Sequence, residues 1–212
     1  KLAVSLLHIN LPENAYNLNL KNLKESTFFM DKHDIGAVYK NLGGIFKRSG
    51  FFEQALKLYE ASLTIFEKFG PRENKAGVIG NIGNIYLDLE RYDEAFACYQ
   101  RYEIETKACK HKVFEFLIYI NYFIYYLDTG AQEKTGNYLT KLKFGIEDFG
   151  LVTTPAVLNY YEGLLEKEKK NYKNAIELFD KAVRFYDDIE KEDENGDCYF
   201  NIGVCYLKLD NI

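Results

Sequence analysis

The chain has 212 residues, of which 47% are hydrophobic and 28% are charged, and its formal net charge is −5. An acidic balance of this kind disfavours nonspecific binding to nucleic acid or to an anionic membrane surface. The most apolar run, Val113–Leu127, contains Glu115 and Asn121 and is shorter than the roughly 20 residues that span a bilayer. It predicts a buried helix, so we expect neither nucleic acid nor membrane among the partners.

The N-terminal residues 1–33 are predicted to hold part of one copy of a pattern that recurs along the chain, with helical patterns over Leu2–Ile9 and Pro12–Met30. In residues 34–73, apolar side chains at helical spacing predict the helices Asp34–Arg48 and Phe52–Phe69. The dipeptide Gly70–Pro71 follows directly, and this order of residues is a strong helix stop signal.

Residues 74–113 are predicted to form the helices Ala76–Leu89 and Tyr92–Cys109, separated by a short polar break. Residues 114–153 follow a degenerate version of the same pattern, which we expect to end at Gly150. Residues 154–193 again predict two helices, the first with Pro155 in its first turn. Residues 194–212 contain only a first helix, so we expect the chain to be a piece of a longer protein.

These segments are copies of one pattern with a period of forty residues. The stretch Asn81–Phe96, NIGNIYLDLERYDEAF, has counterparts at Asn41–Leu56, Tyr161–Ile176 and Asn201–Leu209, and a degenerate one at Asn121–Gly136. A period between about 20 and 50 residues indicates a repeat array, in which each unit packs mainly on its neighbours. The sequence therefore predicts an all-α fold of stacked helix pairs.

The repeated residues resemble the tetratricopeptide repeat. In residues 34–73 its order is followed by Leu42-Gly43, Phe46, Phe52, Ala55 and Tyr59. Residues 74–113 repeat this order with Ile82-Gly83, Tyr86, Tyr92, Ala95 and Tyr99. The unit of forty residues is longer than the usual one and is similar to those of Leu-Gly-Asn adaptors, kinesin light chains and bacterial peptide-pheromone receptors. The resemblance implies a right-handed superhelical solenoid of antiparallel helix pairs.

The repeat at residues 114–153 departs from the family's pattern, with Phe123 in place of Gly and Thr135 in place of Ala. In the repeat at residues 154–193, Glu166 replaces an aromatic residue, and we interpret the charged run Glu166–Lys170 as a solvated helix tip.

In this family the first helix of each pair lines a concave groove, and the residue before Leu-Gly points into it. Here those residues are Asn41, Asn81, Asn121 and Asn201, with Tyr161 in the repeat at residues 154–193. An Asn amide both donates and accepts, so a row of them can bind the backbone of an extended peptide, although Asn is also common in the repeat consensus. The family's clamp for acidic chaperone tails needs a basic residue where Ala37, Gly77 and Leu117 stand, so we do not expect that ligand.

The neighbouring groove positions hold small and basic residues in the early repeats and apolar residues in the later ones. Large exposed apolar patches mark partner sites, although curvature of the array would also cover these residues. The remaining candidate peptide-binding residues are Asn84, Lys47, Arg48, Leu117, Ile120, Ile124, Tyr160, Leu164 and Phe200.

Catalytic, metal and cofactor sites are not predicted. His8, His33 and His111 lack a nucleophilic partner at a motif spacing, and the four cysteines contain no Cys-x-x-Cys pair. Free thiols of this kind are typical of a reducing compartment, so we expect a cytoplasmic location.

The sequence thus favours a noncatalytic scaffold module that holds a peptide or a helix of a protein partner. Two alternatives stay open: a regulatory sensor that controls an output domain outside this segment, and an architectural spacer with no groove ligand.

Overall fold

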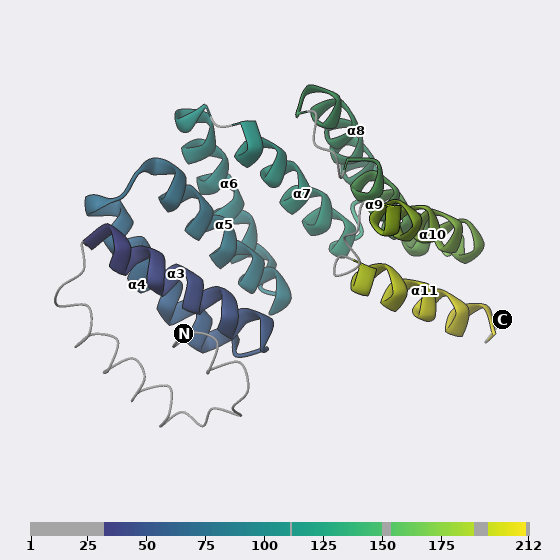
Figure 1. The fold of residues 1–212 in the computed structure, drawn as a ribbon, viewed down its shortest axis with the longest axis horizontal. Helices are drawn as coiled ribbons and strands as arrows, with labels where there is room; N and C mark the ends of the chain where they lie inside the picture. Colours follow the sequence, from purple (N-terminus) through teal and green to yellow (C-terminus); the bar gives the residue numbers. More distant parts are fainter. Residues whose placement is uncertain (1–31, 111, 150–153, 189–194, 211–212) are drawn as a thin grey trace. The chain divides into compact units, whose positions relative to one another are not determined.

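The computed structural model describes residues 32–110, 112–149, 154–188 and 195–210. Over these ranges the chain forms nine α-helices, α3 to α11, and no strand (Figure 1). The predicted all-α class is therefore confirmed, and consecutive helices pack as antiparallel pairs. The predictions for Leu2–Ile9, Pro12–Met30, His8, His111 and Gly150 lie outside the described residues.

The chain divides into two compact units, residues 1–118 and residues 119–212. The described part of the first unit contains the pairs α3 (Lys32–Arg48) with α4 (Phe52–Phe69) and α5 (Arg72–Asp88) with α6 (Tyr92–Cys109). Figure 1 shows each pair side by side. The bounds predicted for α4 and α6 are confirmed to the residue.

Helix α5 begins four residues earlier than the predicted Ala76, because Pro71 is its N-cap. Proline has no N–H to satisfy and its fixed φ suits a helix start. Gly70 ends α4 with φ at −100°, not in the left-handed conformation that a glycine stop usually adopts. Glycine is nevertheless needed there, since a Cβ would lie 2.8 Å from the Cα of Phe66.

Small residues let the paired helices of this unit approach closely. A Cβ at Gly43 would lie 2.9 Å from the ring of Tyr59, and one at Gly83 would lie 2.7 Å from the ring of Tyr99. Ala55 and Ala95, four residues before these tyrosines, are fully buried. Glycine on the first helix thus accommodates an aromatic ring from the second, as interiors packed to crystal-like density require.

The turn inside each of four helix pairs follows one backbone design. Gly50, Glu90, Gly130 and Lys170, forty residues apart, all have positive φ, from 57° to 78°. In each case the next residue donates its N–H to the carbonyl five residues back, as Phe51 does to Phe46 and Arg91 to Tyr86. This pairing is the Schellman motif, which satisfies carbonyls at the helix end. The forty-residue period is therefore present in the backbone as well as in the side chains.

Helix α7 (Lys112–Asp128) contains the division between the units, and the second unit continues with α8 (Gln132–Phe149). Within that unit the two helices are joined by tyrosine rings. The ring of Tyr138 on α8 lies 5.0 Å from that of Tyr122 and 5.6 Å from that of Tyr126, both on α7. Phe123, which replaces the repeat's glycine, packs edge-on against Tyr161 of helix α9 (Thr154–Glu168), with 5.2 Å between ring centroids.

The second unit ends with α9 (Thr154–Glu168), α10 (Tyr172–Asp188) and α11 (Gly196–Leu209). Pro155 lies in the first turn of α9 as predicted. A Cβ at Gly163 on α9 would lie 2.7 Å from the ring of Phe179 on α10, so this pair repeats the packing of the first unit. Helix α11 packs on α10 and buries Cys198, Asn201 and Cys205.

Candidate peptide-binding surface

Asn41 and Asn81 lie on the first helices of the two pairs in the first unit. Asn41 on α3 is exposed and Asn81 on α5 is half-buried. Helices α3 and α5 contact each other, and the side chains of Asn74 and His33 hydrogen-bond between them at 2.9 Å. Neither Asn41 nor Asn81 makes a side-chain hydrogen bond within the described residues. As far as the described part of the chain is concerned, both amides therefore keep their donors and acceptor for a ligand or for water.

Asn84 has a different role, because its side chain holds a buried tyrosine of the paired helix. The hydroxyl of Tyr99, a fully buried residue, donates to Oδ1 of Asn84 at 2.8 Å. A buried hydroxyl needs such a partner. The Asn84 acceptor is thus used in packing α5 against α6.

The equivalent position in the first pair is Gly44, and there a basic residue lies near the tyrosine instead. Burial raises the pKa of Tyr59 to about 12, and the nearby Arg48 guanidinium opposes part of that rise. Arg48 itself is exposed. Lys47 forms an ion pair with Asp88, with 3.2 Å between Nζ and Oδ2, and so connects the ends of α3 and α5.

The beginning of α7 adds apolar surface to the same unit. Leu117 is 39% exposed, whereas Ala37 and Gly77, which occupy the equivalent positions on α3 and α5, are half-buried. A Cβ at Gly77 would lie 3.8 Å from the ring of Phe114, one turn before Leu117. Leu117 is therefore the large apolar candidate of this unit.

In the second unit, Ile120, Asn121 and Ile124 lie on the later part of α7 and are all half-buried. The Asn121 amide makes no hydrogen bond with the residues that the structure describes.

Asn201 is the exception among the four asparagines in register. It is buried, its Oδ1 accepts from Nζ of Lys167 at 2.7 Å, and its Nδ2 donates to the carbonyl of Asp197 at 2.8 Å. Its amide therefore joins α11 to α9, and both of its polar atoms are engaged within the second unit.

Three of the aromatic and apolar candidates lie between helices. Tyr160 packs on Phe179 of α10 with 5.8 Å between ring centroids, and burial raises the pKa of Tyr160 to about 12. Tyr161 contacts Phe123, and Leu164 is buried. Phe200 on α11, in contrast, is 70% exposed. The structure therefore does not gather these four residues on one surface.

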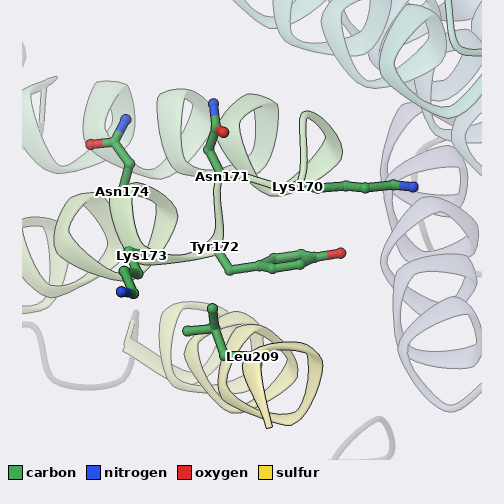
Figure 2. Close-up of a pocket in the computed structure, with 6 residues that line it drawn as sticks. All are labelled: Lys170, Asn171, Tyr172, Lys173, Asn174 and Leu209. Atoms are coloured by element: carbon green, nitrogen blue, oxygen red, sulfur yellow. The ribbon is translucent and has the colours of Figure 1, made fainter. Parts of the chain in front are cut away.

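A pocket that the sequence pattern did not predict lies at the turn between α9 and α10. It has a volume of about 360 Å³ and is lined by Lys170, Asn171, Tyr172, Lys173, Asn174 and Leu209. Figure 2 shows the Tyr172 side chain passing above Leu209, while Lys170 extends away from the turn. The charged run, interpreted as a solvated helix tip, has Glu168, Lys169 and Lys170 exposed, and Glu166 in addition holds the turn together. Its carboxylate accepts hydrogen bonds from Lys169, Asn171 and Asn174.

The described residues contain no cluster of three His, Cys, Asp or Glu side chains that could hold a metal ion. Among the same residues, no helix combines the length and the apolar character needed to cross a membrane. All four cysteines are free thiols.

The forty-residue period, the glycine–aromatic pairs and the repeated Schellman turns define a helical-repeat protein. A family model for the tetratricopeptide repeat matches residues 34–103, which comprise the two pairs of the first unit. Residues 34–103 thus belong to the tetratricopeptide repeat family, as the sequence resemblance indicated. A comparison with curated protein sequences finds no match.

Solved structures with the same fold extend the likeness over nearly the whole chain. BtubC from P. vanneervenii has a TM-score of 0.67 at 12% identity, covering 93% of this chain and 82% of BtubC. The apo form of RapI has a TM-score of 0.60 at 15% identity, covering 93% of this chain and 55% of RapI. A kinesin-light-chain-like repeat protein of Podospora anserina has a TM-score of 0.60 at 11% identity, with coverages of 90% and 93%. At these identities the likeness concerns the fold alone.

Proposed function

We propose that this chain is a noncatalytic protein-binding module, and that the first-helix surface of its first unit holds an extended peptide. The observation that carries the proposal is the contrast among the asparagines. Within the described residues, the amides of Asn41 and Asn81 make no hydrogen bond, whereas those of Asn84 and Asn201 are engaged in packing. Repeats of this family commonly serve protein–protein interaction.

An extended peptide presents a backbone N–H and C=O at regular intervals, and an Asn amide complements both. One such hydrogen bond contributes only about 0.5–1.5 kcal/mol net, because it replaces bonds to water. Apolar contact must then supply most of the affinity, at roughly 25 cal/mol per Å² buried. Leu117, at 39% exposure on the first helix α7, is an apolar side chain of the first unit that is accessible for this contact. In this proposal the asparagines set the position of the peptide backbone, and Leu117 anchors an apolar side chain.

In the second unit, Ile120, Asn121 and Ile124 are partly accessible and are proposed as a contact surface of that unit by itself. Tyr160, Tyr161, Leu164 and Asn201 are not included, because their contacts with neighbouring helices occupy them. Arg48 is exposed at the end of α3, where it would favour a peptide with an acidic residue, whereas Lys47 is already paired with Asp88.

The experiment is a selection of linear peptides from a phage-displayed random library, followed by titration of a selected peptide. Asn41→Ala together with Asn81→Ala should weaken binding at least tenfold, since about 1.4 kcal/mol corresponds to tenfold. The matched control is Asn137→Ala, an exposed asparagine on the second helix α8. Equal binding by the double variant and the wild type would reject the asparagine surface.

The two alternatives make different predictions in the same experiment. A spacer yields no selected peptide at all. A sensor binds peptides as proposed, and in addition its full-length chain carries an output domain whose activity changes on binding.

A further inference from the structure

The hydroxyl group of Tyr59 on α4 lies next to an open position on α3. Tyr59 is only 2% exposed, yet a Cβ built at Gly44 would lie 3.5 Å from its hydroxyl oxygen. Gly44 is half-buried, so the hydroxyl is reached from the surface of α3 through the space that this glycine leaves. Within the described residues the Tyr59 hydroxyl makes no hydrogen bond. Because a buried hydroxyl needs a partner, it is available to a group that enters at Gly44.

The other helix pairs show that this hydroxyl lacks an acceptor that the repeat elsewhere provides. In the second pair the residue equivalent to Gly44 is Asn84, and its Oδ1 accepts from the hydroxyl of Tyr99 at 2.8 Å. Forty and eighty residues further on, both positions are apolar: Ile124 with Leu139, and Leu164 with Phe179. In these three repeats a hydroxyl and its acceptor are present together or absent together. Of the four repeats that the structure describes, only the first has the hydroxyl, that of Tyr59, without the side-chain acceptor.

Arg48 gives this position a positive charge. It lies one turn after Gly44 on α3, and a Cβ at Gly44 would lie 3.8 Å from its Nη1 atom. Arg48 forms no ion pair within the part of the chain that the structure describes, whereas Lys47 beside it is paired with Asp88. Burial raises the pKa of Tyr59 to about 12, so its hydroxyl keeps its proton at neutral pH and can donate. Two donors, one of them charged, thus lie around Gly44.

The group that fits these donors is a carboxylate. It accepts several hydrogen bonds, and hydrogen bonds to an ionised oxygen are roughly twice as strong as those between neutral groups. A carboxylate also has the planar shape and the size of the amide that Asn84 places at this position in the second pair. A peptide carbonyl would satisfy Tyr59 but would leave the Arg48 charge without a partner.

We infer that Gly44, Arg48 and Tyr59 form a carboxylate site, which takes an acidic group of the peptide bound on the first-helix surface of the first unit. The carboxylate accepts from the Tyr59 hydroxyl and from the Arg48 guanidinium, in the space that Gly44 leaves open. Asn41, one turn before Gly44 on α3, is near enough for the same peptide to reach both. The source of the acid rests on the peptide-binding function proposed above, whereas the site itself can be tested without it.

The experiment follows the backbone amide signal of Gly44 by NMR in the 212-residue chain. The probe is a short alanine peptide with blocked ends and one central Glu, and the comparison peptide carries Gln instead. The Glu peptide should shift the Gly44 signal saturably, and the Gln peptide should bind at least tenfold more weakly. A third peptide has no Glu but has a free C-terminal carboxylate. The tighter of the two acidic peptides shows whether the site takes a side chain or a chain end.

Variants of the site test each of its parts. Tyr59→Phe and Arg48→Gln should each weaken binding of the Glu peptide at least fivefold, because each removes one donor. Gly44→Asn should abolish binding, since the introduced amide occupies the site as Asn84 does in the second pair.

The matched controls are Tyr99→Phe, whose hydroxyl already has an internal acceptor, and Lys57→Gln, which removes a positive charge from an exposed position on α4. Both controls should bind the Glu peptide as the wild type does. Equal binding of the Glu and Gln peptides would overturn the site. Losses in the two controls as large as those in Tyr59→Phe and Arg48→Gln would overturn it as well.

The results also separate this site from the function proposed above. A saturable shift of the Gly44 signal by the Glu peptide, with no peptide selected from the random library, supports the carboxylate site and rejects peptide binding by the asparagines. Selected peptides without an acidic residue at a fixed position, together with no shift at Gly44, would overturn the carboxylate site and leave the proposed function standing.

Discussion

The ring of Tyr99 lies over Gly83 so closely that a Cβ at Gly83 would be 2.7 Å from ring carbon Cε1 and 2.9 Å from Cδ1. Tyr99 is fully buried and its hydroxyl is held by Asn84, so the ring has little room to move away. This contact joins a glycine of the first helix to an aromatic of the second. It recurs between Gly43 and Tyr59, and between Gly163 and Phe179.

The first prediction concerns that close approach. Gly83→Ala should destabilise the chain by about 1–3 kcal/mol, the usual effect of overpacking a core. Gly203→Ala should stabilise it by up to about 1 kcal/mol, because α11 has open space there and alanine has the higher helix propensity. Urea unfolding of both variants measures the difference. Equal shifts for the two substitutions would contradict the packing described here.

The second prediction concerns the turns. Glu90 and Lys170 adopt φ of 57° and 63°, at positions where the other two turns have glycine. A side chain in the left-handed region is strained, so Glu90→Gly and Lys170→Gly should each raise stability by about 0.5–1 kcal/mol. Gln100→Gly, at an exposed position inside α6, is the control and should lower stability by about 1 kcal/mol. A loss of stability in both turn variants would show that their side chains contribute more than the strain costs.

The third prediction separates the asparagines by their roles. Asn84→Ala should lower stability by about 1–3 kcal/mol, because it leaves the buried Tyr99 hydroxyl without this acceptor. Asn81→Ala should change stability by less than about 0.5 kcal/mol. Adding Tyr99→Phe to Asn84→Ala should recover part of the loss, and thermal or urea unfolding of the cycle tests this. Additive effects of the two substitutions would indicate that the hydrogen bond contributes nothing.

The fourth prediction is a pH dependence centred on Glu166. Hydrogen bonds from Lys169, Asn171 and Asn174 lower the pKa of this carboxyl group in the folded chain. Its stabilising contribution is therefore complete above the unfolded-state pKa of about 4.3 and is lost as the pH falls through the lower folded-state value. The stability difference between wild type and Glu166→Gln should be largest near neutral pH and should shrink in acid.

Urea unfolding at a series of pH values measures that difference. Glu177→Gln on α10 is the control, because Glu177 is exposed and forms no ion pair within the described part of the chain. A difference for Glu166→Gln that stayed constant from neutral pH into acid would show that the lowered pKa does not contribute to folding.

The repeat period predicted much of the local structure correctly. The bounds of α4 and α6 follow from the spacing of apolar residues, since helical periodicity fixes which side chains share a face. The start of α5 was misplaced, because Pro71 was interpreted only as the end of α4 and is in fact also the N-cap of α5. The positive φ of Glu90 and Lys170 was also missed, since neither residue type indicates a left-handed conformation.

What the sequence determined by itself is the helical hairpin and its repetition, because both depend on residues close together in the chain. It placed Asn201 among the peptide-binding candidates on the same grounds as Asn41 and Asn81, and it added Asn84 as a further candidate. Only the tertiary structure distinguished them, through the Tyr99 hydroxyl on α6 and the Lys167 ammonium on α9. Whether an amide is hydrogen-bonded depends on a side chain from another helix. A repeat pattern predicts the position of that helix but not which polar atoms lie within reach of the amide.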